Sequence, residues 1–279
     1  MEVNRGLEDS YLLFDRVTAM RGRGESGQVA VETAIVLPLF VFLLLGILQL
    51  GMMHQARLLT KYAAYKAVRA GSLHNADVEV MERAALAVLL PMVSQAGGGG
   101  AEVLKPIASA SDFAQKWNSS GISQNKMPDA DLKYAQVHIC GPLKADITSG
   151  THANKELDFD DPRVASGGDW AESLRTKLSI QVTFNYRLPI PFADVTIFNI
   201  ARGQKALPYV LRLGKEENHT KKSYVDFRTD PLDAAAENKL YILPIRATYI
   251  MRMHSNFYLT QKALPEVNKC TFTFDQAAE

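Results

Sequence analysis

The longest uncharged stretch of the chain runs from Thr33 to Met53 and consists almost entirely of apolar residues. A helix rises about 1.5 Å per residue, so a run of this length covers a hydrocarbon core of about 30 Å. Beyond it, apolar positions keep a helical spacing as far as Gly71, while Arg57 and Lys61 lie on the polar face. The pattern predicts one transmembrane helix that continues past the membrane.

After residue 72 the pattern changes to shorter elements. Polar and apolar residues alternate from Lys177 to Leu188, the period of a strand with one buried face, and Pro189 ends it because proline cannot donate to a ladder. We expect further strands over 133–140, 241–253 and 271–274, and helices over 77–93, 111–117 and 194–201. Gly97–Gly100 is expected to be a linker and 214–233 a polar surface loop. These elements predict an α+β fold, in which a long N-terminal transmembrane helix leads into a globular domain with an antiparallel sheet.

A single carboxylate, Glu32, stands directly before the apolar run. A charged side chain in a spanning helix is disfavoured, although less so near the membrane edge than at its centre. Glu32 is therefore either a solvated residue at the start of a plain anchor or one half of an ion pair whose other half need not belong to this chain. Pro38 interrupts the run and removes a backbone donor, which helices tolerate at membrane depth when neighbouring helices satisfy the freed carbonyl. With Gly27 five positions before Glu32, this pattern favours a helix that packs against other helices.

Residues 1–26 mix acidic and basic side chains without a sustained period. A secretory signal would have a shorter apolar core followed by small residues at a cleavage site, whereas here the span has full length and small residues precede it. We interpret this segment as a cytoplasmic leader, for which Met1 and Met20 both fit as the start. A large domain after the span can be translocated regardless of flanking charge, so the N-terminus is expected inside.

Composition narrows the class of protein. With 47% hydrophobic and 22% charged residues the chain is not disordered, and a net charge of +1 provides no basic field for nucleic acid. The roughly 200 residues after the span suffice for one domain with its own core. Cys140 and Cys270 are compatible with a disulfide or with two buried thiols, and the disulfide is favoured if the domain lies in an oxidising compartment.

Catalytic and metal-binding motifs do not occur in the chain, so we expect no enzyme activity, no cofactor and no metal. His138 and Cys140 could share one strand face as a metal pair, but they have no visible third ligand, and a packed strand is the favoured interpretation. For the acidic cluster of Asp158, Asp160, Asp161 and Asp169 a solvated loop is favoured over a calcium site. The alternative hypothesis is a membrane-anchored extracytoplasmic enzyme or ligand-binding domain with a dispersed site. A plain anchor that is never cleaved is a third.

The stretch from Gly27 to Phe40, followed by Leu45 to Gly51, resembles the N-terminus of TadE-like proteins. These are pseudopilins of the tight-adherence (Flp pilus) system, with a type IV pilin-like N-terminus. The resemblance implies that a prepilin peptidase cuts between Gly27 and Gln28, so that Glu32 becomes the fifth residue of the mature chain. It also implies that Glu32 pairs with the new N-terminal amine of an adjacent subunit. Thr33 stands where the family usually has an aromatic residue.

The resemblance also implies the organisation and function of the chain. Residues 1–27 would be a prepilin-type leader, 28–72 the transmembrane and extended helix, and 73–279 a periplasmic or extracellular α+β domain. The protein would be a non-catalytic pilin-like subunit in the inner membrane. Its partners would be the prepilin peptidase, membrane lipid and other pilus-assembly subunits, which contact it through the N-terminal helix. Candidate helix-packing positions are Pro38, Gly46 and Gly51.

Overall fold

The computed structural model describes residues 25–96, 102–119, 121–148, 156–160, 175–201, 230–258 and 264–270. The chain divides into two compact units at the bond between Leu48 and Gln49. Of the first unit, the structure describes the N-terminal part of helix α2 (Glu25–Leu73). The second unit contains the remainder of α2 and all other elements.

The core of the second unit is built on the C-terminal part of α2. Most of its buried positions are small: Ala56, Thr60, Ala63, Ala64 and Ala67 are inaccessible to solvent, as is the larger Val68. Their spacing of three and four residues places them on one face of the helix, where short side chains let neighbouring elements approach closely. The Thr60 hydroxyl donates to the carbonyl of Ala56 at 2.7 Å, so it needs no partner outside the helix.

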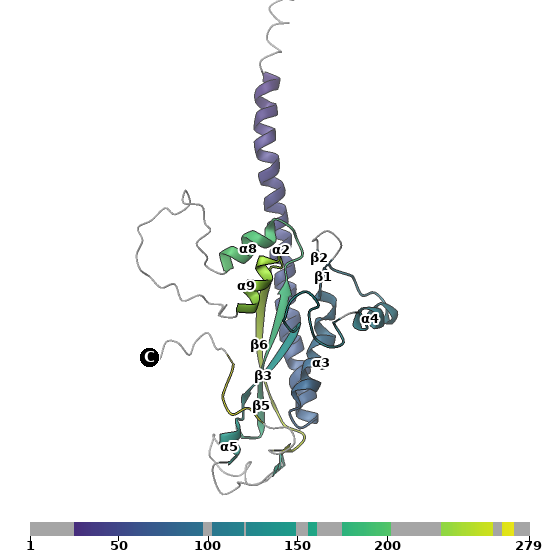
Figure 1. Ribbon diagram of the computed structural model, residues 1–279, viewed down its shortest axis with the longest axis vertical. Coiled ribbons are helices and arrows are strands. Elements are labelled where there is room, and N and C mark those ends of the chain that lie inside the picture. Colours follow the sequence, from purple (N-terminus) through teal and green to yellow (C-terminus); the bar gives the residue numbers. More distant parts are fainter. Residues whose placement is uncertain are drawn as a thin grey trace, which may run out of the picture. The chain divides into compact units, whose positions relative to one another are not determined.

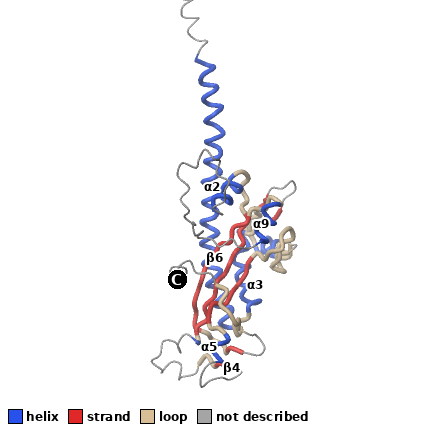
Figure 2. Tube along the Cα trace, turned by 60° about the vertical axis from the view of Figure 1, so that its left-hand side comes forward, coloured by secondary structure: helices blue, strands red, loops and turns tan. Residues whose placement is uncertain are grey.

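A three-stranded antiparallel sheet lies along this helix, in the order β3 (Ala135–Gly141), β5 (Lys177–Arg187) and β6 (Ile242–Arg252) (Figures 1 and 2). The register pairs Val137 with Val182 and Val182 with Ala247, which places the apolar positions of all three strands on one face. This face packs on α2, as the edge-to-face contact of Tyr65 with Tyr249 at 5.4 Å shows. The predicted antiparallel sheet is confirmed.

Shorter elements surround this helix-and-sheet layer. The helices are α3 (Val78–Leu89), the 3₁₀ turn Leu90–Met92, α4 (Ala110–Trp117), α5 (Lys144–Thr148), α8 (Ala193–Ala201) and α9 (Asp230–Glu237). Two small antiparallel pairs join β1 (Gln95–Ala96) to β2 (Glu102–Val103) and β4 (Glu156–Leu157) to β7 (Phe257–Tyr258).

Most predicted elements agree with the structure to within a few residues, and α2 ends at Leu73 as its pattern indicates. The helix expected over 77–93 stops at Leu89 and continues as a 3₁₀ turn at Pro91. The strand expected over 271–274 and the linker Gly97–Gly100 lie outside the described residues. The loop expected over 214–233 is wrong at its end, because α9 begins at Asp230. A proline follows Asp230, a common helix start, and Leu232 and Ala235 are buried.

The central strand also differs from its prediction, because both of its faces are buried from Gln181 onward. At its end the guanidinium of Arg187, which is 3% exposed, donates to both carboxylate oxygens of Asp129 at 2.8 Å and to Glu102 at 3.1 Å. Upstream, Asn185 donates to the carbonyl of Lys133 at 2.8 Å. The alternation of polar and apolar residues in β5 therefore does not separate an exposed face from a buried face. It separates an apolar buried face from a polar buried face, where carboxylates distant in the sequence pair with the charge of Arg187.

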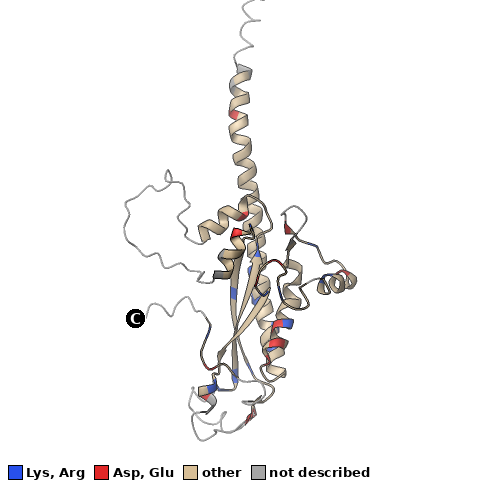
Figure 3. Ribbon diagram, in the orientation of Figure 1, with Lys and Arg blue, Asp and Glu red and all other residues tan. Residues whose placement is uncertain are grey.

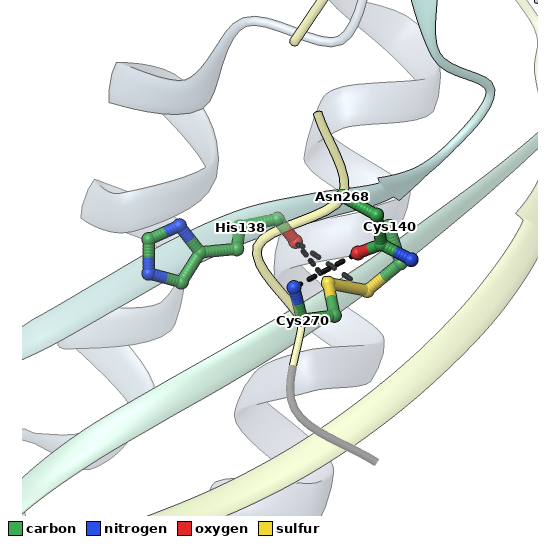
Figure 4. Close-up of a disulfide and its surroundings, with 4 residues drawn as sticks. All are labelled: His138, Cys140, Asn268 and Cys270. Atoms are coloured by element: carbon green, nitrogen blue, oxygen red, sulfur yellow. Dashed lines mark hydrogen bonds between the residues drawn. A yellow bond between two sulfur atoms is a disulfide. The ribbon is translucent and has the colours of Figure 1, made fainter. Parts of the chain in front are cut away.

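Cys140 on β3 and Cys270 form a disulfide with a Cα–Cα distance of 5.5 Å (Figure 4). The segment before Cys270 is held near β3 and α5 as well, since Lys144 donates its backbone N–H to the carbonyl of Pro265 at 3.1 Å. Because the sulfur of Cys140 is bonded to Cys270, it is not available as a metal ligand beside His138. The bridge joins residues 130 positions apart and so closes a long loop.

Both ends of the packed part of α2 are fixed by polar groups. Gln49 is fully buried, and its side-chain oxygen accepts from the backbone N–H of Ile190 at 3.0 Å. At the other end the carbonyl of Ser72 accepts from the N–H of His254 at 3.0 Å and from the hydroxyl of Ser255 at 2.9 Å. These bonds satisfy buried backbone groups and hold the ends of the strands against the helix.

At Gly71, helix α2 lies close to both helix α3 and strand β5. A Cβ there would lie 2.8 Å from Cγ of Met81 and 2.9 Å from Cδ2 of Leu178, whereas at Gly51 it would meet no atom within 4 Å. We predict that Gly71→Val lowers the free energy of unfolding by about 1–3 kcal/mol relative to Gly51→Val, because overpacking displaces the sheet. Thermal unfolding of the two purified full-length variants measures this, and equal transition temperatures would contradict the packing.

Tyr186 generates a pH-dependent prediction. Burial raises the pKa of its phenol to about 12, against a smaller lowering by a side-chain hydrogen bond with Gln49. The unfolded chain therefore loses this proton first, and stability falls as the pH rises from about 10 to about 12. Tyr186→Phe should flatten the decline of the unfolding free energy in this window. Chemical denaturation at several pH values tests this, with exposed Tyr62→Phe as the control; a decline as steep as in the unchanged chain would refute it.

Candidate membrane and assembly helix

The first half of α2 exposes an apolar surface on all sides. Of the described residues, one helix, over Val29–Leu73, is long and apolar enough to cross a membrane, and its most apolar window has no buried residue. Leucine, isoleucine and phenylalanine side chains between positions 35 and 48 are mostly more than half exposed. A soluble surface rarely presents such a continuous apolar area, so this part of α2 requires a cover of lipid or of other apolar helices.

Charge is almost absent from this surface. Glu32 is the one charged residue between Val29 and Met53, and the outer part of α2 is otherwise drawn in the colour of uncharged residues (Figure 3). Its side chain is exposed. Next to it, the hydroxyl of Thr33 donates to the carbonyl of Val29 at 2.8 Å. The polar group of Thr33 is thus satisfied within the helix, so that it adds little cost to placing this turn at the membrane edge.

Gly27 lies in the first turn of α2, which begins at Glu25, three residues before the start expected from the sequence. It is exposed, and a Cβ at this position would meet nothing within 4 Å. The first backbone N–H groups of a helix have no partner within it, so this turn opens more readily than the turns that follow. The peptide bond between Gly27 and Gln28 therefore lies where the chain is accessible.

Pro38 lies inside the helix, and its nitrogen cannot donate to the carbonyl of Ala34 four residues earlier. Gly46 and Gly51 have open space around them, so no packing within this chain requires glycine at either position. Five residues correspond to a rotation of about 140° around the helix, which places the two glycines on different sides. These positions leave room for a close approach from outside the chain.

Sequence reasoning missed Gln49, whose amide links the helix to the segment after β5 through Ile190. Its only signal in the sequence was a polar residue within an apolar run, and nothing nearby indicated a partner 141 residues away. Among the described ranges no group of three or more His, Cys, Asp or Glu side chains could hold a metal ion. Of the acidic loop, Asp158 accepts from the N–H of Asp160 at 3.1 Å, while Asp161 lies outside the described residues.

Comparison with known proteins identifies the same region. Residues 27–69 match the model of the TadE-like protein family. The match begins at the exposed Gly27 and ends within α2, four residues before Leu73, so it does not include the sheet. No curated protein and no solved structure matches the chain.

Proposed function

We propose that this chain, which is identified as TadE-like by the match over residues 27–69, is a non-catalytic pilin-like subunit of a tight-adherence pilus assembly system. The observation that carries the proposal is the contrast between the two parts of α2. Val29–Leu48 is exposed and apolar around its circumference, whereas the part after Gln49 has small residues buried against the sheet. A helix built in this way anchors a folded domain and offers its other half to lipid or to the same helix of other subunits.

The first step of the proposed function is processing by a prepilin peptidase between Gly27 and Gln28. The exposed glycine in the first helical turn, directly before the membrane span, supports it. Cleavage removes the leader and creates a positively charged amine at Gln28. That amine lies four residues before Glu32, about 6 Å away along the helix axis.

The second step is lateral assembly through the helix. Glu32 of one subunit pairs with the new amine of its neighbour, which offsets part of the cost of placing either charge among apolar helices. A neighbour displaced along the helix axis would bury an unpaired charge, so the pair selects one register. The open space at Gly46 and Gly51 supports close helix contact, and a neighbouring helix can satisfy the carbonyl that Pro38 leaves without its donor.

The proposed location is the inner membrane, with the N-terminus in the cytoplasm and the domain in the periplasm or outside the cell. The disulfide between Cys140 and Cys270 supports this orientation, because disulfides persist in oxidising compartments and are rare in the cytosol. Membrane lipid, the prepilin peptidase and other pilin-like subunits are the partners that this topology requires.

Processing is tested by the mass of the protein purified from membranes that contain the peptidase. We expect an N-terminus at Gln28 in the unchanged chain and a retained leader in Gly27→Leu, since a bulky side chain would occupy the cleavage position. Gly24→Leu is the matched control, because it changes another leader glycine and should leave cleavage intact. An unchanged chain that keeps its leader would contradict the proposal, whereas Thr33→Phe, which introduces the usual aromatic residue, should still be cut.

Assembly is tested separately with Glu32→Ala and Glu32→Gln. Both variants should be cleaved at Gln28 but should lose association with other subunits by about a hundredfold or more, since breaking a buried ion pair costs about 3–5 kcal/mol. Crosslinking and co-purification from membranes measure the association. Glu25→Ala is the control, because its carboxylate leaves with the leader. If Glu32→Gln assembles normally, the carboxylate charge has no role in pairing.

A further inference from the structure

An exposed apolar surface also occurs in the domain, on the segment that follows the central strand. Phe192 is 72% exposed, and on helix α8 Ile200 is 64% and Val195 38% exposed. On the same helix Ala193 and Phe198 are buried, and the ring of Phe198 lies 5.3 Å from that of Tyr241. Helix α8 thus carries apolar side chains at exposed as well as at buried positions.

The chemistry of α8 is unusual for a helix that faces water. Asp194, in its first turn, is its one charged residue, and the sequence from Val195 to Ala201 contains no charged side chain. A solvated helix normally carries charged residues opposite its buried face. The exposed residues Val195 and Ile200 therefore suit an apolar or interfacial environment better than bulk water.

The backbone keeps Phe192 in this exposed position. Its φ angle is 70°, in the left-handed region that bulky residues rarely occupy and that costs about 1–2 kcal/mol. The surrounding turn is fixed, because Asp194 donates its N–H to the carbonyl of Ile190 at 3.0 Å and the hydroxyl of Thr196 donates to the carbonyl of Phe192 at 3.1 Å. The fold therefore holds the ring of Phe192 outward despite the conformational free energy that this backbone angle costs.

The position of this segment along α2 indicates what the ring meets. Ile190, two residues before Phe192, donates its N–H to the side chain of the buried Gln49 on α2. Gln49 is four residues before the end of the uncharged run at Met53, a distance of about 6 Å along a helix. Leu50, beside it, is 57% exposed. The apolar surface of Phe192 and α8 is therefore adjacent to the point where the span leaves the bilayer.

From this adjacency we propose that Phe192, Val195 and Ile200 lie in the interface of the membrane leaflet that faces the domain, in contact with lipid. The proposal rests on the proposed function in one respect, namely that Thr33–Met53 spans a membrane. An interfacial helix lies in the plane of the bilayer with its apolar side chains about 5–10 Å deep at the headgroup boundary, where aromatic rings are favoured. The domain would thereby be held to the membrane at a second point besides the span, which fixes its orientation before lateral assembly.

The test places a fluorescent reporter at the ring itself. Phe192→Trp exchanges one exposed aromatic residue for another, so the fold is retained. The full-length variant is reconstituted in phosphatidylcholine vesicles with or without bromine on the acyl chains near the headgroups. We expect blue-shifted emission that brominated lipid quenches. The native residues Trp117 and Trp170 give the background, which is measured with the unchanged chain.

Ile250→Trp is the matched control, because Ile250 is 58% exposed on the edge strand β6 and its new ring should remain in water. Quenching at position 192 should exceed quenching at position 250 several-fold. Equal quenching overturns the proposal, and so does a blue shift at position 192 without quenching, which would mean that protein covers the ring. Alkaline carbonate extraction of the same vesicles tests the span separately. If the Phe192→Trp chain resists extraction while its introduced indole stays unquenched, only the interfacial contact is refuted, whereas an extracted chain refutes the membrane anchor.

Discussion

Between Gln49 and Leu73, helix α2 presents alanine, threonine and glycine to the sheet, and the rest of the domain is arranged around this close contact. Small side chains allow β5 to approach the helix along its length, so that larger residues of the strands, such as Phe184 and Tyr186, fill the remaining space. The buried amide of Gln49 and the carbonyl of Ser72 then fix the two ends. A bulky residue at any of these helix positions would separate the layers, because a close-packed interior cannot absorb the added volume.

The same helix has opposite requirements in its two halves. After Gln49 the helix has small residues that pack closely within the chain, whereas before Gln49 its apolar side chains are exposed. The family match covers the helix across both halves and ends before the sheet begins. In the proposed function the helix makes the contacts with other subunits, and the folded domain that it anchors exposes its surface outside the membrane.

Charged groups that are shielded from solvent in the domain pair with one another. Arg187 binds Glu102 and Asp129 beneath the end of the central strand, and Glu82 on α3 binds Lys133 at 2.7 Å. Removing one member of such a cluster would leave a buried charge without its partner, so these residues stabilise the arrangement of loops and strands. The exposed apolar groups on α8 are different, because no contact among the described residues accounts for them.

The sequence by itself determined the features that depend on local period and composition. The uncharged length of 33–53 and the alternation of 177–188 are properties of consecutive residues, and they predicted a long helix and a strand at these positions. Only the tertiary structure decided which distant groups meet. It showed that Cys140 is joined to Cys270, that Arg187 meets carboxylates 58 and 85 positions away, and that Gln49 reaches Ile190. The period of apolar residues shows which face of a helix or strand is apolar. The partner of a buried polar group depends on which distant segments the fold brings together, and consecutive residues carry no signal of that.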